Sequence, residues 1–457
     1  IVLQCKKVFK NIIAYYKFDF DGKKESMYAL RPAFDTVADM IGKGKKVPES
    51  LLEIFAQNPE YSAKLDSLIN AKDKVPFKIF DKKNAEKLFG KNLNISASQL
   101  EKFNLCRFSY FCNYGLNVRE RQRAEINPMQ YGTIVHYILE RFFGEYTKEE
   151  YLSLEEDKFQ KIVCAYLAEY AVKYFGEEQL ESNSFTYRLK TILDNVMYLM
   201  KHIMEELSQS EFFVADCELK IGEDIPSYTI VLPDGHKIAV CGSVDRVDIM
   251  QRADITYLRI IDYKTGTKQF KLSDILYGIN LQMLLYLHSI EASGGDKYGE
   301  IVPAGILYMP ATVPYISSDS LKSIDKLPDE LNKKLKMNGL LLKDTEIIHG
   351  MDKTDVATYI PVKIKAGEPV SSTSLATLAE FGKIFKKVDM LIAEMGKNIY
   401  NGNIEAKPLK GGHDSCEYCP YDSVCAYRQS NPITCFSVDN KTVIEEITNE
   451  INGKEEE

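Results

Sequence analysis

The sequence predicts an α/β fold in which a mixed central β-sheet is flanked by helices. Three observations lead to this fold class. Hydrophobic residues recur with a helical period up to about residue 209, and apolar and polar residues then alternate with a period of two between residues 212 and 264. A helix, a strand and a long helix follow. Helices before a run of strands, and then alternating helix and strand, are typical of an α/β core with a mixed sheet.

The two ends of the chain are expected to lie outside the main domain. Residues 1–95 alternate helical segments with lysine-rich connections and carry no chemical motif, so we interpret them as the helical remnant of a preceding domain. The chain begins at Ile1 rather than methionine, which favours a fragment of a longer protein. Residues 436–457 end in the run GKEEE and are expected to form an acidic tail. The sequence thus predicts a main domain over residues 96–435.

Helices open this main domain. Ser96 is a suitable N-cap for a short amphipathic helix that begins after it. A second helix is expected over residues 131–143, with His136 and Glu140 four residues apart on one stripe of its surface. Further helices are expected over residues 150–209.

Four strands follow the helices, separated by turn sequences such as Pro-Asp-Gly. They are expected over residues 212–221, 227–232, 236–250 and 256–264. The elements beyond them are a helix over residues 276–292, a strand over 303–309 and a long helix over 375–402 that closes at Gly402.

The composition narrows the class of protein. Hydrophobic residues make up 45% of the 457 residues and charged residues 27%, which are ordinary values for a globular protein. There is no apolar run long enough to span a membrane and no signal peptide, so we expect a cytoplasmic protein without a membrane partner. The net charge of −8 argues against a nucleic-acid-binding surface over the whole protein, but it is compatible with a local basic groove.

The stretch IIDYKTG contains the first chemical motif. Asp262 and Lys264 lie two residues apart on an apolar strand, so their side chains face the same side of the sheet. Burying two charges is costly unless they pair or bind a metal, and a salt bridge alone explains an isolated pair of this kind. Asp245 on the preceding strand brings a second carboxylate close. Two carboxylates and a backbone carbonyl make an oxygen-rich site suited to Mg2+ or Mn2+.

Four motifs, taken in order along the chain, resemble those of the PD-(D/E)xK nuclease superfamily, and more narrowly its RecB-type nuclease family. They are GTIVH, GSVDRVD, DYKTG and QMLLY. The resemblance implies a restriction-endonuclease-like core that cleaves DNA with Mg2+ or Mn2+. The metal ligands that it implies are His136, Asp245, Asp262 and the carbonyl of Tyr263. It further implies that Lys264 is the catalytic lysine, and that Gln282 and Tyr286, one helical turn apart, position this lysine or the substrate phosphate.

Other charged residues on the strands have two interpretations. Glu218 is either an exposed strand glutamate or the acidic residue that related nucleases often keep near the metal. Arg246 and Asp248 are expected to form structural ion pairs.

The cysteine spacing indicates a second metal centre. Cys416, Cys419 and Cys425 supply three soft ligands within ten residues, and a fourth ligand is required. On local spacing alone Cys435 completes a zinc-ribbon-like site, and Cys112 is a further reserve ligand.

The RecB-type nucleases that contain an iron-sulfur cluster have one cysteine before the nuclease core and three after it. The resemblance therefore implies Cys106 as the fourth ligand and a 4Fe-4S cluster that staples the N-terminal and C-terminal parts of the domain together.

Three further stretches, at residues 336–344, 360–369 and 399–412, resemble the C-terminal part of the AddB-type subunit of bacterial ATP-dependent helicase-nucleases. This resemblance implies an AddA-type helicase-nuclease partner and cleavage of the single-stranded DNA produced when double-strand breaks are processed for repair and recombination. The chain has no phosphate-binding loop of the Walker A type, so we do not expect it to bind ATP itself. The alternatives are a CRISPR-adaptation-type iron-sulfur exonuclease, an inactive DNA-binding or scaffold module, and an iron-sulfur electron-transfer protein.

Overall fold

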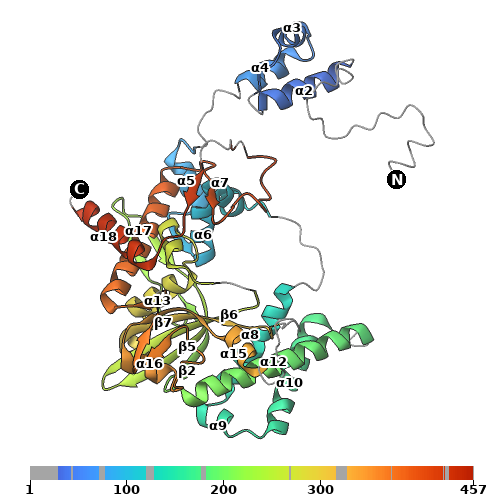
Figure 1. Ribbon diagram of the computed structural model, residues 1–457. Coiled ribbons are helices and arrows are strands. Elements are labelled where there is room, and N and C mark those ends of the chain that lie inside the picture. Colours follow the sequence, from blue (N-terminus) through green and yellow to red (C-terminus); the bar gives the residue numbers. More distant parts are fainter. Residues whose placement is uncertain are drawn as a thin grey trace. The chain divides into compact units, whose positions relative to one another are not determined.

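A six-stranded mixed β-sheet carries the core of the protein in its computed structural model (Figure 1). The chain divides into two compact units, Ile1–Pro76 and Phe77–Glu457. The residues that the structure describes are 29–42, 45–70, 78–119, 128–176, 182–266, 269–314, 327–371, 373–425, 427 and 432–455.

Three helices form the described part of the first unit. They are α2 (Leu30–Gly42), α3 (Glu49–Gln57) and α4 (Ser62–Asn70). Their apolar faces meet in a small core, where the rings of Phe34, Phe55 and Tyr61 contact one another. This region is helical, as the sequence predicts. Ile1 and the rest of residues 1–28 lie outside the described residues.

The second unit includes residues that precede the predicted domain boundary at residue 96. α5 (Lys82–Phe89) and β1 (Asn92–Ile95) belong to it, and β1 pairs in parallel with β4 (Lys237–Val240). A small sheet of order β1-β4-β3 results, in which β3 is Thr229–Val231. Residues 78–95 thus pack with the second unit, whereas the sequence predicts a helical remnant up to residue 95. Pairing between strands so distant in the chain leaves no local signal.

The main sheet has the strand order β11-β8-β7-β6-β5-β2. Its strands are β2 (Phe213–Ile221), β5 (Gly242–Arg252), β6 (Ile255–Lys264), β7 (Glu300–Pro310), β8 (Asn338–Leu342) and β11 (Leu375–Ala376). β6 runs parallel to β7 and β8 runs parallel to β11, while the other neighbours are antiparallel. The predicted mixed sheet of an α/β fold is confirmed.

The run expected as one strand over residues 236–250 is instead divided between two sheets. Cys241 separates β4 in the small sheet from β5 in the main sheet. At this break the backbone of Gly242 lies close to the side chain of Tyr286. A Cβ atom at Gly242 would lie only 2.2 Å from Tyr286 Oη. Glycine alone leaves room for this tyrosine, and glycine within a strand commonly marks such an approach. The alternating sequence pattern continues through the break and therefore does not reveal it.

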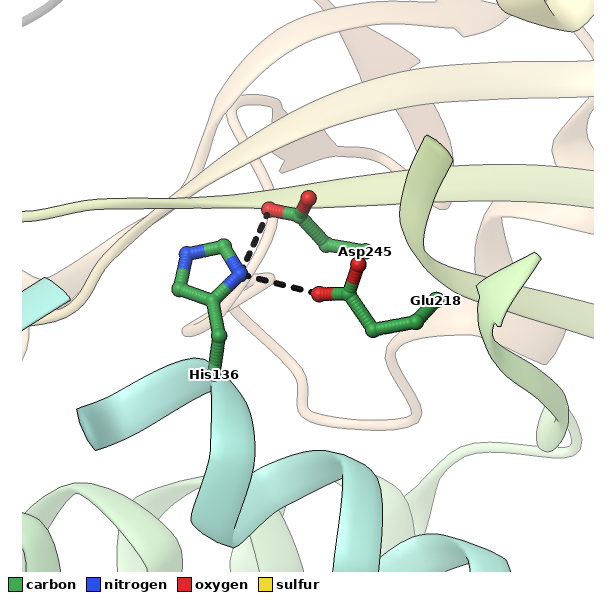
Figure 2. Close-up of side chains that lie close together, drawn as sticks. All are labelled: His136, Glu218 and Asp245. Atoms are coloured by element: carbon green, nitrogen blue, oxygen red, sulfur yellow. Dashed lines mark hydrogen bonds and ion pairs between the residues drawn. The ribbon is translucent and has the colours of Figure 1, made fainter. Parts of the chain in front are cut away.

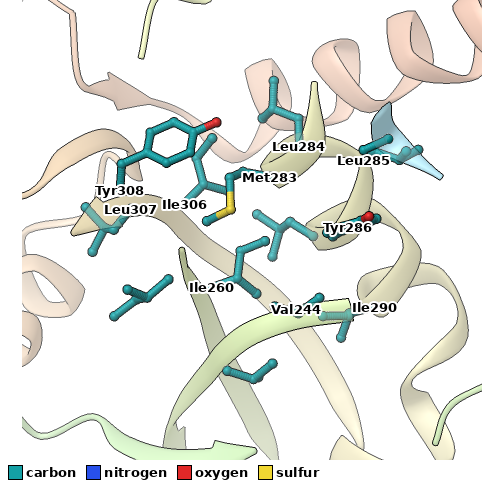
Figure 3. Close-up of a cluster of buried hydrophobic side chains, with 14 of the residues drawn as sticks. Val244, Ile260, Met283, Leu284, Leu285, Tyr286, Ile290, Ile306, Leu307 and Tyr308 are labelled. Atoms are coloured by element: carbon teal, nitrogen blue, oxygen red, sulfur yellow. The ribbon is translucent and has the colours of Figure 1, made fainter. Parts of the chain in front are cut away.

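Helices flank the main sheet and complete its core. α8 (Pro128–Glu145) packs against β2 and β6, and α13 (Gln282–Ser293) packs against β6 and β7. Figure 3 shows buried side chains of α13, such as Met283, beside Ile260 and Ile306 of the sheet. The fold therefore packs both helices that carry a predicted motif against β6, the strand of Asp262.

The predicted ends of two helices are confirmed. Ser96 caps α6 (Ala97–Leu105) in a capping box with Gln99. The long C-terminal helix is α17 (Leu378–Tyr400), and Gly402 follows it with a φ of 69°. A Cβ atom at Gly402 would lie 2.0 Å from the carbonyl oxygen of Ile79, so glycine is needed both for the backbone conformation and for this contact.

The last residues include a packed helix. α18 (Asn440–Glu455) buries Val443 and Ile447 and contacts α17, where Lys387 forms a 2.5 Å ion pair with Glu450. The segment predicted as an acidic tail thus contributes to the core, because its apolar residues recur at helical spacing between the charged ones.

The remaining elements are shorter or lie away from the sheet. They are α7 (Arg107–Tyr110), the π-helical turn η2 (Phe111–Gly115), α9 (Lys148–Leu152), α10 (Glu156–Phe175), α12 (Asn183–Gln209), the 3-10 helix η3 (Leu272–Tyr277), α14 (Gly295–Tyr298), α15 (Leu327–Leu335), α16 (Thr345–Met351), β9 (Lys363–Lys365), β10 (Glu368–Val370), β12 (Leu409–Gly411) and β13 (Ile433–Cys435). Among the described residues, none of the helices has the length and apolar character that crossing a membrane requires.

Candidate active site

Three side chains with metal-binding atoms meet at the edge of the main sheet. His136 comes from α8, Glu218 from β2 and Asp245 from β5, and Figure 2 shows them pointing toward one another. His136 Nδ1 lies 3.1 Å from Glu218 Oε1 and 3.6 Å from Asp245 Oδ2. One ligand atom of each residue lies within 4.8 Å of the other two, so the three residues are close enough to bind a single ion.

The backbone of Glu218 adopts a conformation that side chains normally avoid. Its φ is 50°, in the left-handed region, although it lies within strand β2. Its neighbour Cys217 pairs with Arg246, which sets Glu218 opposite Asp245 on the adjacent strand. A conformation of this kind costs a residue other than glycine about 1–3 kcal/mol and is found most often at functional sites.

The three side chains displace one another's pKa values. Burial alone would raise the pKa of Glu218, but hydrogen bonds from His136 and from Ser243 Oγ, which lies 2.8 Å from Glu218 Oε2, lower it. Burial alone would lower the pKa of His136, but the bond to Glu218 and the charges of Asp245 and Asp262 raise it. The carboxylates therefore attract a positive charge to this point.

Asp245 is more buried than Glu218, with 11% of its side chain exposed against 27%. Burial, followed by the charge of Asp262, raises the pKa of Asp245 to about 7. Its Oδ2 accepts a hydrogen bond from the backbone N–H of Tyr263 at 2.9 Å, which fixes the carboxylate against strand β6. The raised pKa of Asp245 next to a second carboxylate favours binding of a cation, because a cation stabilises both charges at once.

Asp262 and Lys264 lie together, as the alternation of a strand requires. Lys264 Nζ is 2.5 Å from Asp262 Oδ2, and the Asp262 side chain is only 3% exposed. The contact is an ion pair without hydrogen-bond geometry, since this buried oxygen has no hydrogen-bond partner among the described residues. Lys264 also lies over the ring of Tyr308, with Nζ 5.8 Å from the ring centre. A buried carboxylate that is paired with a lysine keeps further lone pairs with which it can bind a metal ion.

These donors fit a divalent cation. Carboxylate oxygens are preferred by Mg2+ and Mn2+, and an imidazole nitrogen can complete such a set. The structure brings together His136 and Asp245 of the predicted ligands, adds Glu218, and directs the carboxylate of Asp262 toward Lys264. The ligand roles, including that of the Tyr263 carbonyl, stay predictions.

Gln282 and Tyr286 lie in the first turns of α13. Tyr286 is 5% exposed, and burial raises its pKa to about 12, with contributions from the charges of Asp245 and Asp262. The tyrosine therefore lies in the electrostatic range of the two carboxylates. Gln282 is half-buried at the first position of the helix. Their proposed action on Lys264 or on a substrate phosphate stays a prediction.

Sequence reasoning did not single out three residues that contact this site. Ser243 holds Glu218, Tyr308 lies under Lys264, and Glu101 Oε1 accepts a hydrogen bond from the backbone N–H of Leu281 at 2.8 Å, just before α13. For Ser243 a signal was present, because it lies two residues before Asp245 and so shares its side of the strand. The other two contacts depend on tertiary structure.

A buried network of charges supports the strands from their other face. Arg246 and Asp248 pair as the sequence predicts, with Nη2 and Oδ2 separated by 2.7 Å, and Arg259 and Glu206 complete the network. All four side chains are fully buried. Arg246 Nη1 also donates to Tyr263 Oη at 3.3 Å, which ties the network to the strand residue that holds Asp245.

Four cysteines from distant parts of the chain line one cavity of about 180 Å³. They are Cys106, Cys416, Cys419 and Cys425. Cys106 ends α6, and burial raises the pKa of its thiol. Four thiols around one cavity are a donor set that can bind a zinc ion or an iron-sulfur cluster.

The two reserve cysteines do not line this cavity. Cys435 lies in β13 and packs in a separate cluster with Ile279 and Leu409. Cys112 is buried next to Cys106 but is not among the described residues of the cavity wall. The local alternative of a zinc-ribbon-like site completed by Cys435 is therefore not favoured by the structure.

Comparison with known proteins extends these observations. The sequence profile of the PD-(D/E)XK nuclease superfamily matches residues 94–426, which include His136, Asp245, Asp262 and all four cavity cysteines.

Curated relatives are named as one of the subunits of an ATP-dependent helicase/deoxyribonuclease. The protein of a Thermoanaerobacter species is 30% identical over 452 residues, which are 93% of this chain and 39% of the relative. That of Clostridium acetobutylicum is 31% identical over 460 residues, again 93% of this chain and 39% of the relative. That of Clostridium kluyveri is 35% identical over 397 residues, 83% of this chain and 34% of the relative. The chain thus spans less than two-fifths of the length of these relatives.

Proposed function

The chain belongs to the PD-(D/E)XK nuclease superfamily, and on this basis we propose that it is a Mg2+- or Mn2+-dependent deoxyribonuclease that hydrolyses phosphodiester bonds of single-stranded DNA. The observation that carries the proposal is the meeting of His136, Glu218 and Asp245 within 4.8 Å, beside the ion pair of Asp262 and Lys264. A carboxylate cluster next to a lysine suits phosphodiester hydrolysis, because both the attacking water and the leaving oxygen need charge stabilisation.

Each residue then has a role that follows from its contacts. A divalent cation, when bound, would supply Lewis-acid activation of water and neutralise phosphate charge. His136, Glu218 and Asp245 would hold it, and the N–H of Tyr263 keeps Asp245 in position. Lys264, fixed by Asp262, keeps a positive charge at the same point and is suited to orient the attacking water or to stabilise charge on the phosphoryl oxygens.

We further propose that the cysteine cavity holds a 4Fe-4S cluster bound by Cys106, Cys416, Cys419 and Cys425. The support is a donor set of four thiols, from two distant parts of the chain, that line one cavity. The cluster would close a loop of more than three hundred residues, from Cys106 to Cys416, so we assign it a structural role in stapling the two ends of the nuclease domain together.

The biological setting is a proposal drawn from the relatives. Their name describes one component of an ATP-dependent helicase/deoxyribonuclease. We propose by analogy that this chain acts with an AddA-type helicase-nuclease partner in the processing of double-strand breaks for DNA repair and recombination. A cytoplasmic location belongs to the same proposal.

The nuclease assignment is tested with labelled single-stranded DNA and Mg2+. The Lys264→Ala variant should lose at least about 100-fold in cleavage rate and keep its binding of DNA, since a charge-stabilising group contributes that much. Lys237→Ala, which removes an exposed lysine of β4, is the matched control and should cut like wild type. Equal cleavage by Lys264→Ala and wild type would contradict the proposal, and so would cleavage that is independent of divalent metal.

A further inference from the structure

A groove opens directly beyond the strand that carries Asp262 and Lys264. Its volume is about 800 Å³, and its wall begins with Thr265 and Gly266, the two residues that follow Lys264. The rest of the wall includes residues from the end of β7, from α15, from the start of β8 and from the connections next to these elements. Because β6 and β7 run parallel, the carboxyl ends of both strands meet at this groove.

Packing joins the groove to the metal-binding residues. α8, which carries His136, touches the groove wall one turn before that histidine, where a Cβ atom at Gly132 would lie 3.7 Å from Thr265 Cγ2. The residue directly before Gly132 makes a second contact. Tyr131 Oη donates a hydrogen bond to the carbonyl oxygen of Ala311, just after β7, at 3.1 Å. The end of β6, against which α8 packs, therefore lies between the groove and the candidate active site.

The charge of the groove is opposite to that of the protein. Three lysines line it, Lys333, Lys334 and Lys336, and none of its described lining residues is acidic. The whole chain has a net charge of −8, so three lysines without an acidic wall residue are a local concentration of positive charge.

Two of the three lysines differ in how they are held. Lys336 Nζ donates to the carbonyl oxygens of Ala357 and Val362 at 2.6 and 3.1 Å, which fixes its charge in the wall. The side chain of Lys333 is 70% exposed and pairs with Glu330 on the same helix at 2.8 Å. Exposed pairs of this kind contribute about 0–1 kcal/mol, so a phosphate can compete for the lysine.

The uncharged part of the wall suits a nucleic-acid strand as well. Phe270 lines the groove and is half-buried, and its backbone N–H is held by Asn338 Oδ1 at 2.8 Å. An aromatic ring beside exposed lysines is the combination on which proteins bind single strands, since bases stack on rings and cations follow the phosphates.

We propose that this groove binds the sugar-phosphate backbone of single-stranded DNA on one side of the scissile bond. The inference rests on the proposed function. A basic groove could bind any polyanion, and we choose DNA because the groove adjoins Lys264 of the proposed nuclease site. It adds the binding determinants Lys333 and Lys334, which form no part of the metal site.

The test measures binding of a labelled 20-nucleotide DNA to the full chain without divalent metal, so that cleavage does not interfere. In the double variant Lys333→Gln with Lys334→Gln, affinity should fall on the order of tenfold at moderate salt. The slope of log K against the logarithm of the salt concentration should become shallower by about 1.4, because each of the two lost phosphate contacts contributes about 0.7. The charge-conserving variant Lys333→Arg with Lys334→Arg should bind like wild type.

The matched control replaces two exposed lysines of α10, Lys158→Gln with Lys161→Gln, and should leave affinity unchanged. Unchanged binding in the groove variant would overturn the proposal, as would an equal loss in the α10 control or failure of wild type to bind the strand at all. Cleavage of the same DNA by wild type with Mg2+ is measured separately. If wild type binds through the groove but does not cut, the nuclease proposal fails and the groove assignment stands.

Discussion

At the scale of single residues, the site combines predictable chemistry with one unusual backbone position. His136, Asp245 and Asp262 are residue types that bind metals, and their motifs mark them in the sequence. Glu218 has no such mark, because a glutamate on a strand is common. Its φ of 50° shows that the fold accepts a costly backbone in order to turn this carboxylate toward His136.

This strain leads to a prediction for substitutions of Glu218. Glu218→Gly should be more stable than Glu218→Ala by about 1 kcal/mol, because glycine adopts a positive φ without a steric cost. Lys220, an exposed residue of the same strand, should show the opposite order, with alanine more stable than glycine. Denaturant unfolding of the four variants measures the difference. The same order at both positions would show that the backbone of Glu218 is not strained.

Asp245 leads to a prediction about metal binding. Wild type should gain about 2.7 kcal/mol of stability when Mn2+ is raised to a hundred times its dissociation constant, because only the folded state assembles the site. Asp245→Asn should lose this gain, since the amide keeps the shape and can accept from Tyr263 but carries no charge. Asp254→Asn, in the exposed turn between β5 and β6, should respond like wild type. A Mn2+-dependent rise in the Tm of Asp245→Asn as large as that of wild type would exclude Asp245 as a ligand.

At the scale of elements, α13 presents its motif residues because a later turn of the same helix is anchored to its surroundings. α13 carries Gln282 and Tyr286 at its start, and His288 later in the same helix is held by α17. His288 Nε2 lies 3.0 Å from Asp389 Oδ1, its ring stacks on Phe385, and Tyr228 donates to the same aspartate oxygen. Neither periodicity nor motif reveals this anchor, because its partners lie about 60 and 100 residues away.

The anchor leads to a pH-dependent stability. Burial alone would lower the pKa of His288, but hydrogen bonds with Asp389 and Glu291 and their charges raise it to about 9. A raised pKa in the folded state stabilises the protein while the histidine is protonated. The contribution is complete below about pH 6.5, the value for the unfolded chain, and is lost as pH rises through about 9.

Unfolding by denaturant should therefore show a drop in wild-type stability between pH 6.5 and pH 9.5 that is smaller in His288→Asn. His349→Asn, on α16, is the matched control and should keep the wild-type pH dependence. If His288→Asn and wild type lose the same stability over this range, the ion pair does not anchor α13.

At the scale of the whole molecule, two distant segments join around the cysteine cavity. The end of α6 and the segment after β12 both contribute to it, although the whole nuclease core lies between them in the sequence. The sequence spacing left Cys106 and Cys435 open as the fourth ligand. Only the tertiary structure separates them, by placing Cys106 in the cavity wall and Cys435 in another cluster.

The cluster proposal predicts different outcomes for these two cysteines. Cys106→Ser should remove the visible absorbance of the cluster and lower stability by roughly 3–5 kcal/mol, judged from covalent bridges that close long loops. Cys435→Ser should keep the absorbance and lose little stability. Absorbance spectra and denaturant unfolding of both variants measure these effects. Loss of the absorbance in Cys435→Ser but not in Cys106→Ser would contradict the split arrangement.

The sequence by itself determined the α/β class, most helices and strands, and the side chains suited to bind a metal, because hydrophobic period and motif are local properties of the chain. It also determined that Asp262 and Lys264 share one side of a strand. Only the tertiary structure decided that Glu218 joins His136, that the expected strand over residues 236–250 divides at Cys241 between two sheets, and that a basic groove lies beyond Lys264. These features arise where distant segments meet, and such contacts depend on packing that no local pattern encodes.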